Sequence, residues 1–451
     1  MDNQLVLIFQ TILSVTIQQN GFFVCGNKID PFRVIWNSRI EECQPTFGVK
    51  INLTRWGIER NTPPYNGWYG DVLHLTNGDF GEWPAIDNKG NIHNGGVPQK
   101  MDLNKHLHKV ANYLQSNISQ DWKGVGVLDF EGWWPRFEDN MNNVLFKRYC
   151  NYSMHLVRQA FPTWNESQVY NQAALEFDSA ARVAWTATLE LAKYLRPGQG
   201  WAYYRFPICI GRKADNLTCP NQFHNDRLAW LWETSDFLYP SIYFYGLPHK
   251  WERGHRQFVF SLISETLRCR NKVDRPDLPI LAYTKFYTQT TPLLIYDTID
   301  LINSIGLLGD MGVEGTIMWG DKMGEVNKTR CLETKEYMDN VLGPLVFEVK
   351  KFVSHCSETQ CSSHGRCYMA EVPMLKNLNK GFEEFDIMNA VRKSNLTSRF
   401  NQIDIARLGY FLVKDYKKTH STEMVNMNMY KCRCFNGYTG SSCEHQQVTQ
   451  N

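Results

Sequence analysis

The sequence predicts an α/β fold in which a parallel sheet closes into a TIM-like (β/α) barrel, followed by a small disulfide-rich module. Between about residues 35 and 345, short apolar runs alternate with longer segments of helical periodicity, the pattern of strands that alternate with helices. After residue 347 the composition changes and six cysteines follow. With 451 residues, the chain is long enough for a barrel over 28–346 and a second unit over 347–451.

The expected elements follow in chain order. Apolar residues at three- and four-residue spacing predict the first long helix: Leu103, Leu107, Val110, Leu114 and Ile118. Further helices are expected over 173–195, 257–268 and 293–308, and Arg196-Pro197-Gly198 ends the first of these three. Strands are expected over 124–130, 201–206, 237–243, 279–283 and 315–319.

Two carboxylates stand at the end of the strand expected over 124–130. Because side chains on a strand alternate between its faces, Asp129 and Glu131 should point the same way. In (β/α) barrels, the active site lies at the carboxyl ends of the strands, where both acids are expected. Most glycosidases act through a pair of carboxyl groups, so this pair predicts a glycosidase.

Charge and motif content argue against several other functions. The 48 basic and 46 acidic residues give a net charge of +2, which provides no bulk attraction toward nucleic acid. His106 and His108 lie beside Lys105 and Lys109, so they read as a solvated helix face, and we expect neither a metal site nor a cofactor. The sequence has no phosphate-binding glycine loop and no Gly-X-Ser-X-Gly motif. Its aromatic content of 13%, with 14 Trp, suits a cleft that stacks on sugar rings.

Several features predict a secreted glycoprotein. The apolar residues 5–17 indicate a signal peptide over about 1–24, although Asp2 is atypical of its charged start. Residues 443–451 are polar, so we expect no membrane anchor. The chain has 13 cysteines, which in an exported protein indicate disulfides. Seven glycosylation sequons begin at Asn52, Asn117, Asn151, Asn165, Asn216, Asn327 and Asn395.

The cysteines of the last hundred residues follow a recognisable spacing. Cys432 and Cys434 are separated by one residue, and a Gly-Tyr-X-Gly turn at 437–440 lies in the last loop, before Cys443. This pattern resembles an epidermal-growth-factor-like module. Its third and fourth cysteines are separated by residues 368–431, so we expect a long insertion in the module.

Five separate motifs resemble the hyaluronidase family (glycoside hydrolase family 56), the secreted glycosidases of venoms and animal tissues. The resemblance covers roughly residues 34–345, and the interrupted six-cysteine tail is similar to that of the longer members. It implies a distorted (β/α) barrel that hydrolyses β-1,4 bonds to N-acetylhexosamine within hyaluronan, often with activity on chondroitin. The motifs are Asn94-Gly95-Gly96-Val97-Pro98-Gln99, the run from Gly124 to Glu131, Tyr239-Pro240-Ser241-Ile242-Tyr243, Trp319-Gly320, and Cys331 with Leu342-Gly343-Pro344.

The resemblance also implies roles for individual residues. Glu131 would donate the proton to the leaving oxygen, and Asp129, by raising the cost of ionising both acids, would help to keep one proton on the pair. In this family the acetamido oxygen of the substrate is the nucleophile, so Asp129 would orient that group. Tyr204 and Tyr243 would line the subsite, and Trp319 would pack against the acetamido methyl.

One residue departs from the family pattern. The run after Glu131 usually contains Trp-Arg-Pro, whereas this chain has Trp133-Trp134-Pro135. A guanidinium close to the acids is therefore expected to be missing, and its loss would change the pH optimum or the rate. The neighbouring Arg136 is one candidate to replace it.

Family position implies five disulfides and leaves three cysteines open. Cys25 would leave with the signal peptide, while Cys150 and Cys269 would be either buried thiols or an extra bridge. The implied pairs are Cys43 with Cys331, Cys209 with Cys219, Cys356 with Cys367, Cys361 with Cys432, and Cys434 with Cys443.

The expected partner is a glycosaminoglycan polysaccharide, bound by a secreted, extracellular monomer. Two alternatives remain at this point. One is a glycan-binding or adhesion protein of the same fold with weak or no turnover, which Trp134 and the C-terminal module favour. The other is a hydrolase that prefers chondroitin, since hyaluronan and chondroitin differ in one hydroxyl configuration and in sulfation.

Overall fold

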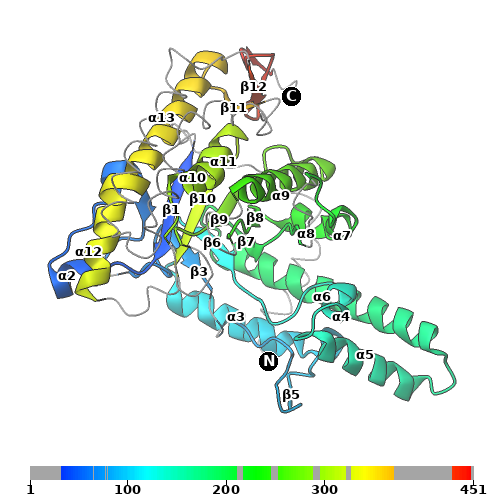
Figure 1. The fold of residues 1–451 in the computed structure, drawn as a ribbon. Coiled ribbons are helices and arrows are strands. Elements are labelled where there is room, and N and C mark those ends of the chain that lie inside the picture. Colours follow the sequence, from blue (N-terminus) through cyan, green and yellow to red (C-terminus); the bar gives the residue numbers. More distant parts are fainter. Residues whose placement is uncertain are drawn as a thin grey trace, which may run out of the picture.

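The computed structural model describes residues 32–63, 65–76, 78, 80–210, 217–244, 252–287, 295–320, 327–369 and 429–447. The expected signal peptide, Cys25 and most of the expected insertion lie outside these residues. Parallel strands form the centre of the molecule, and helices surround them (Figure 1). The barrel strands are β1 (Arg33–Ser38), β2 (Glu59–Arg60), β3 (Leu73–Leu75), β6 (Val125–Leu128), β7 (Gly200–Arg205), β8 (Tyr239–Pro240), β9 (Leu281–Thr284) and β10 (Gly315–Gly320).

These strands form two parallel four-stranded sheets, ordered β2-β1-β10-β9 and β3-β6-β7-β8. Backbone bridges between β8 and β9, Leu238 to Ile280 and Ser241 to Tyr283, join the sheets along one side. Between β2 and β3 the junction is a side chain, because the amide of Asn61 donates to Leu73 O at 3.0 Å and accepts from Leu73 N at 2.9 Å. The two sheets therefore form the expected barrel, distorted at this junction.

Helices connect the barrel strands in the expected order. The longest, α6, begins earlier than expected, because the side chain of Asn165 caps it in a reciprocal capping box with Gln168. The helices are α2 (Cys43–Phe47), α3 (Leu103–Asn117), α4 (Phe137–Met141), α5 (Lys147–Ala160), α6 (Glu166–Leu195), α7 (Gln222–Asp226), α8 (Ala229–Thr234), α9 (Glu252–Lys272), α10 (Thr298–Leu301), α11 (Leu307–Asp310), α12 (Lys328–Tyr337) and α13 (Gly343–Gln360).

Short elements complete the barrel region. The helix expected over 293–308 is described from Thr298 and contains a π-helical turn, η4, between α10 and α11. The remaining short elements are η1 (Thr54–Trp56), η2 (Pro98–Lys100), η4 (Ile302–Gly306), η5 (Met338–Leu342), β4 (Ala85–Ile86) and β5 (Ile92–His93).

The alternation of side chains along the strands divides the core into two layers. In β6, the inner layer receives Val125 and Val127, while Gly126 and Leu128 face the helices. Gly126 has no room for a side chain, since an added Cβ would lie 2.1 Å from the ring of Trp201 on β7. The inner layer is Ile35, Leu73, Leu75, Val125, Val127, Ala202, Phe237, Tyr239, Tyr243, Leu281, Tyr283 and Ile317.

The prediction of a solvated face at His106 is wrong. His106 is fully buried between α3 and α6, where its Nδ1 accepts from the Glu82 backbone N–H at 3.0 Å and its Nε2 bonds to Thr188 Oγ1 at 2.9 Å. Burial lowers the pKa of His106 to about 4, so the ring is neutral at most working pH values. The flanking lysines suggested a solvated face, but neighbouring residues of a helix point about 100° apart, so a buried residue can directly follow an exposed one.

The C-terminal segment packs beside the loop that precedes β10. Its strands are β11 (Gly365–Met369), β12 (Tyr430–Cys434), β13 (Tyr438–Thr439) and β14 (His445–Gln446). Arg366 forms an ion pair with Glu314 at 3.3 Å, and Arg433 donates to Gly312 O at 3.0 Å. Both partners precede β10, so the C-terminal segment lies at the amino ends of the barrel strands.

Ten of the described cysteines form five disulfides, and these are the five expected pairs. Cys43 and Cys331, 288 positions apart, connect α2 with α12. Cys150 and Cys269 are free and buried, and burial raises the pKa of both thiols above the ordinary range. The other pairs are Cys209 with Cys219, Cys356 with Cys367, Cys361 with Cys432, and Cys434 with Cys443.

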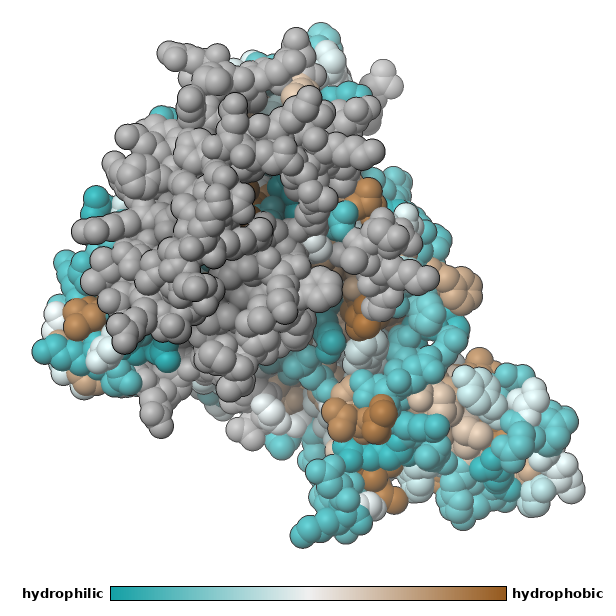
Figure 2. All heavy atoms as spheres, in the orientation of Figure 1, coloured by the Kyte–Doolittle hydropathy of each residue, from teal (hydrophilic) through white to brown (hydrophobic). Residues whose placement is uncertain are grey.

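α5 and α6 extend away from the barrel as a pair of packed helices (Figure 1). The visible described surface of this projection is largely hydrophilic, with separate hydrophobic patches (Figure 2). Isolated exposed apolar residues are normal on a protein surface. Within the described part of the chain, no helix is long and apolar enough to cross a membrane.

Candidate active site

The two acids lie just beyond the carboxyl end of β6. Asp129 continues the inward row of Val125 and Val127, and its backbone N–H donates to Thr76 Oγ1 at 2.9 Å. Phe130 lies on the opposite side and stacks on Trp83 with ring centroids 4.1 Å apart. The strand end is thus held on both sides, which fixes the direction in which the carboxylates leave the backbone.

Asp129 is largely buried, and its Oδ1 has no hydrogen-bond partner. Burial, and to a lesser degree the charge of Glu131, raises the pKa of Asp129 from 3.8 to about 7. A buried polar atom without a partner costs free energy, so such an atom marks a place where a ligand donor would be stabilising.

Glu131 has the opposite surroundings. Its side chain is 54% exposed, and its Oε1 lies 3.2 Å from Nη1 of Arg205 at the end of β7. The pair is therefore asymmetric: one acid is buried and the other reaches into solvent. Burial and the neighbouring charge of Glu131 favour the protonated form of Asp129, the buried member of the pair.

Two tyrosines lie beside the acids. The Tyr204 hydroxyl donates to Ser241 Oγ at 3.2 Å, and the Tyr204 ring lies 6.3 Å from that of Tyr243. Tyr243 is buried in the inner layer, and the Lys285 Nζ lies 4.8 Å above its ring. Burial raises the pKa of both tyrosines, so both hydroxyls are protonated and can donate hydrogen bonds.

Trp319 occupies the equivalent end of β10. It is partly buried against the inner layer, and its ring lies 5.7 Å from that of Trp68, whose Nε1–H donates to Gly320 O at 3.4 Å. The five residues expected at the site therefore lie at the carboxyl ends of the strands β6, β7 and β10 and just after β8. The group comprises two carboxyl groups, two tyrosine hydroxyls and an indole at one end of the barrel.

Comparison with known proteins identifies the family. A family model described as hyaluronidase matches residues 26–447. The chain belongs to the hyaluronidase family. Hyaluronidase-3 of Rattus norvegicus is 32% identical over 352 residues, which cover 75% of this chain and 82% of that protein. Hyaluronidase-1 of Bos taurus is 30% identical over 448 residues, which cover 97% of this chain and 93% of that protein.

Solved structures agree with this family membership. The crystal structure of bee venom hyaluronidase is similar, with a TM-score of 0.61 and 28% identity, over 70% of this chain and 99% of that one. A second crystal structure, of bee venom hyaluronidase in complex with a hyaluronic acid tetramer, has a TM-score of 0.59 and covers 69% of this chain and 98% of that one. As a member of the hyaluronidase family, this chain is a glycoside hydrolase of the hyaluronoglucosaminidase class.

The sequence analysis missed two cationic residues at this hyaluronidase-type site. Arg205 contacts Glu131, and its guanidinium carbon lies 5.0 Å from the ring centroid of Trp134. Lys285 follows β9 and contacts Tyr243. Both residues lie at strand ends, and this position could have identified Lys285 from the sequence. It could not have identified Arg205, because regular strand alternation would have placed its side chain on the face opposite Tyr204.

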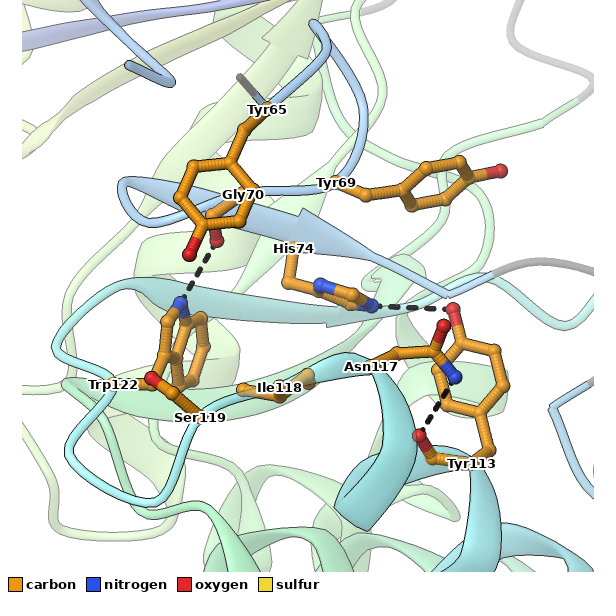
Figure 3. A pocket seen from close by; sticks show the side chains of 9 residues that line it. All are labelled: Tyr65, Tyr69, Gly70, His74, Tyr113, Asn117, Ile118, Ser119 and Trp122. Atoms are coloured by element: carbon orange, nitrogen blue, oxygen red, sulfur yellow. Dashed lines mark hydrogen bonds between the residues drawn. The ribbon is translucent and has the colours of Figure 1, made fainter. Parts of the chain in front are cut away.

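The small pocket lined by tyrosines is separate from this site. It has a volume of about 140 Å³ and lies between α3 and the outer face of β3, where His74 Nε2 bonds to the Tyr113 hydroxyl at 3.1 Å (Figure 3). Asp129 belongs to the inner side of the same sheet. Among the described residues, no group of three or more His, Cys, Asp and Glu side chains could hold a metal ion.

Proposed function

We propose that this chain hydrolyses β-1,4 bonds to N-acetylhexosamine within hyaluronan, with retention of configuration and with the substrate's acetamido oxygen as nucleophile. The observation that carries the proposal is the buried, unpartnered Oδ1 of Asp129 beside an exposed second acid. Support also comes from the similar bee venom enzyme, whose structure is known with a hyaluronic acid tetramer.

Asp129 would receive the acetamido N–H on its free oxygen. This bond orients the acetamido oxygen toward the anomeric carbon, and a carboxylate there stabilises the positive charge of the cyclic oxazolinium intermediate. Accepting a hydrogen bond favours the ionised form of Asp129, whereas burial alone favours its protonated form.

Glu131 would give its proton to the leaving-group oxygen and later remove one from the attacking water. It is the acid that extends from the barrel into solvent, where the glycosidic oxygen can reach it. Because two adjacent carboxylates repel each other, ionisation of Asp129 on substrate binding favours placing the shared proton on Glu131. Substrate binding would thus prepare the acid for the reaction.

The aromatic residues would form the rest of the subsite. The protonated hydroxyl of Tyr243 can hydrogen-bond to the acetamido group and fix its orientation, while Tyr204, whose hydroxyl donates to Ser241, would line the subsite. The partly exposed indole of Trp319 offers an apolar face for the acetamido methyl. No cofactor is needed for these steps.

The deciding experiment is incubation of the purified protein with hyaluronan and, separately, with chondroitin between pH 3 and pH 8. We expect hyaluronan to shorten and new reducing ends to appear. Faster cleavage of chondroitin would replace hyaluronan as the main substrate and keep the mechanism. Binding without cleavage of either polymer would refute the proposal and favour a glycan-binding protein.

We also infer that the protein is secreted and carries N-linked glycans. The sequons at Asn52, Asn117, Asn151, Asn165 and Asn327 are exposed, while those at Asn216 and Asn395 lie outside the described residues. Expression in animal cells should release the protein into the medium, and enzymatic removal of N-glycans should increase its electrophoretic mobility. Retention in the cell, or unchanged mobility, would contradict this inference.

A further inference from the structure

We propose that Arg205 is the positioning residue for Glu131, and that the indole of Trp134 holds the Arg205 guanidinium in place. The proposal rests on the proposed role of Glu131 as the proton donor. It assigns functions to Arg205 and Trp134, two residues outside the expected set of site residues.

The contacts of Arg205 connect two strand ends. Its Nη1 lies 3.2 Å from Oε1 of Glu131, beyond β6, while its own backbone ends β7. Its side chain is 35% exposed and that of Glu131 54%, so the ion pair is partly open to solvent, where substrate can cover it. The pair engages Oε1 and leaves Oε2 of Glu131 as the oxygen that can exchange a proton with the glycosidic oxygen.

Trp134 provides a fixed surface beneath the guanidinium, whose carbon lies 5.0 Å from the ring centroid. Its backbone is held on both sides by Asn140, which accepts from Trp134 N at 2.8 Å and donates to Trp134 O at 2.7 Å. Asn140 is fully buried, so the backbone of Trp134 is anchored to the protein interior, and its partly buried side chain packs against the core. A guanidinium held over this ring and paired with Glu131 has fewer accessible orientations than a free one.

The backbone of Arg205 is evidence that its side chain has a role. Its φ is 82°, in the left-handed region that favours glycine. An arginine here is less favourable for folding than a glycine would be, and strained residues of this kind concentrate at functional sites. The turn at Arg205 also ends the regular alternation, which would have directed the side chain away from the face of Tyr204.

Arg136, the candidate raised by the sequence, does not supply the guanidinium. Its side chain is 3% exposed and forms ion pairs with Glu138 at 2.7 Å and Asp139 at 3.4 Å. Both partners belong to α4, beyond Trp134 in the chain. Arg205 therefore provides, from another strand, the positive charge that appeared to be missing from the run around Trp134.

The test is Arg205→Gly, measured for kcat, KM and thermal stability on whichever polymer the wild-type enzyme cleaves. We expect kcat to fall by about 10- to 100-fold through loss of orientation, with little change in KM. The melting temperature should stay the same or rise, because glycine suits the left-handed backbone. Arg158→Ala, which removes an exposed, ion-paired arginine from α5, is the control and should leave kcat unchanged.

Two further measurements separate positioning from a merely structural role. Guanidinium chloride at a non-denaturing concentration should partly restore kcat to Arg205→Gly, whereas sodium chloride at the same ionic strength should not. Trp134→Ala should lower kcat more than Trp134→Phe, which retains an aromatic face. Trp134→Arg alone should give no large increase, since it places a second guanidinium beside the first.

The outcomes are distinct. An inactive wild-type protein would refute the proposed function itself. An active wild type with unchanged kcat in Arg205→Gly would refute only the role of Arg205. A rise in KM at constant kcat would make Arg205 a substrate-binding residue instead, and a lower melting temperature without guanidinium rescue would make it a structural one.

Discussion

Glu131→Gln should reduce turnover on hyaluronan by about 10²- to 10⁴-fold, because glutamine has nearly the same shape but cannot transfer the proton. The half-exposed side chain of Glu131 contributes little packing, so the variant should fold and melt as the wild type does. Polysaccharide binding should survive, since the loss is confined to the transition state. Reducing-end formation and a binding assay with the same polymer measure the two effects.

The matched control is Glu166→Gln, the same change at an exposed glutamate in the first turn of α6. It should retain full turnover. If Glu131→Gln also turned over at close to the wild-type rate, Glu131 could not be the proton donor, and Asp129 would be the remaining candidate among the two acids.

Asp129→Asn should produce two opposite effects, a loss of activity and a gain of stability at neutral pH. Activity should fall by about 10²- to 10³-fold, because a neutral amide cannot stabilise the positive intermediate. Stability should rise because the buried carboxyl of Asp129 has its pKa raised to about 7, so its ionisation opposes folding.

The sign of the pH dependence follows from proton binding. Between about pH 4 and pH 7, folded Asp129 holds its proton while the unfolded chain has lost it, so wild-type stability falls as the pH rises. The asparagine variant lacks this term, which is at most about 4 kcal/mol above pH 7. Its melting temperature should exceed that of the wild type at pH 8 and match it at pH 4.

Asp121→Asn, at an exposed carboxylate, provides the comparison. It should melt like the wild type at both pH values. An asparagine variant at position 129 that melted at the wild-type temperature at pH 8 would show that burial of Asp129 carries no such energetic penalty.

Much of the fold could be predicted from the sequence because the apolar periods are strong. The strand at β6 and the inward direction of Asp129 follow from alternation alone. Helix α6 began earlier than expected, although Asn165 and Gln168 formed a readable capping signal. A strand was expected over 237–243, but β8 contains only two residues. Isolated bridges replace the regular pairing on either side of it.

The tuning of the site could not be predicted, since it depends on contacts between distant segments. Nothing local to Glu131 indicates that Arg205, 74 positions away, is its partner. Nor does the sequence show that Asp129 is the buried member of the pair, because burial depends on how the strands pack around it. The family resemblance could suggest a role for each site residue, whereas the protonation of the two acids depends on the three-dimensional arrangement around them.

The junction at Asn61 bears on how the two halves of the site are held together. The two acids and both tyrosines belong to one half-barrel, while Trp319 belongs to the other. The halves are joined by backbone pairing between β8 and β9, but across β2 and β3 the amide of Asn61 bonds to Leu73, and Asp71 accepts from the backbone N–H and hydroxyl of Thr62. The half that carries the acids and the half that carries Trp319 are therefore held together on this side by side-chain amide and carboxylate groups instead of by strand pairing.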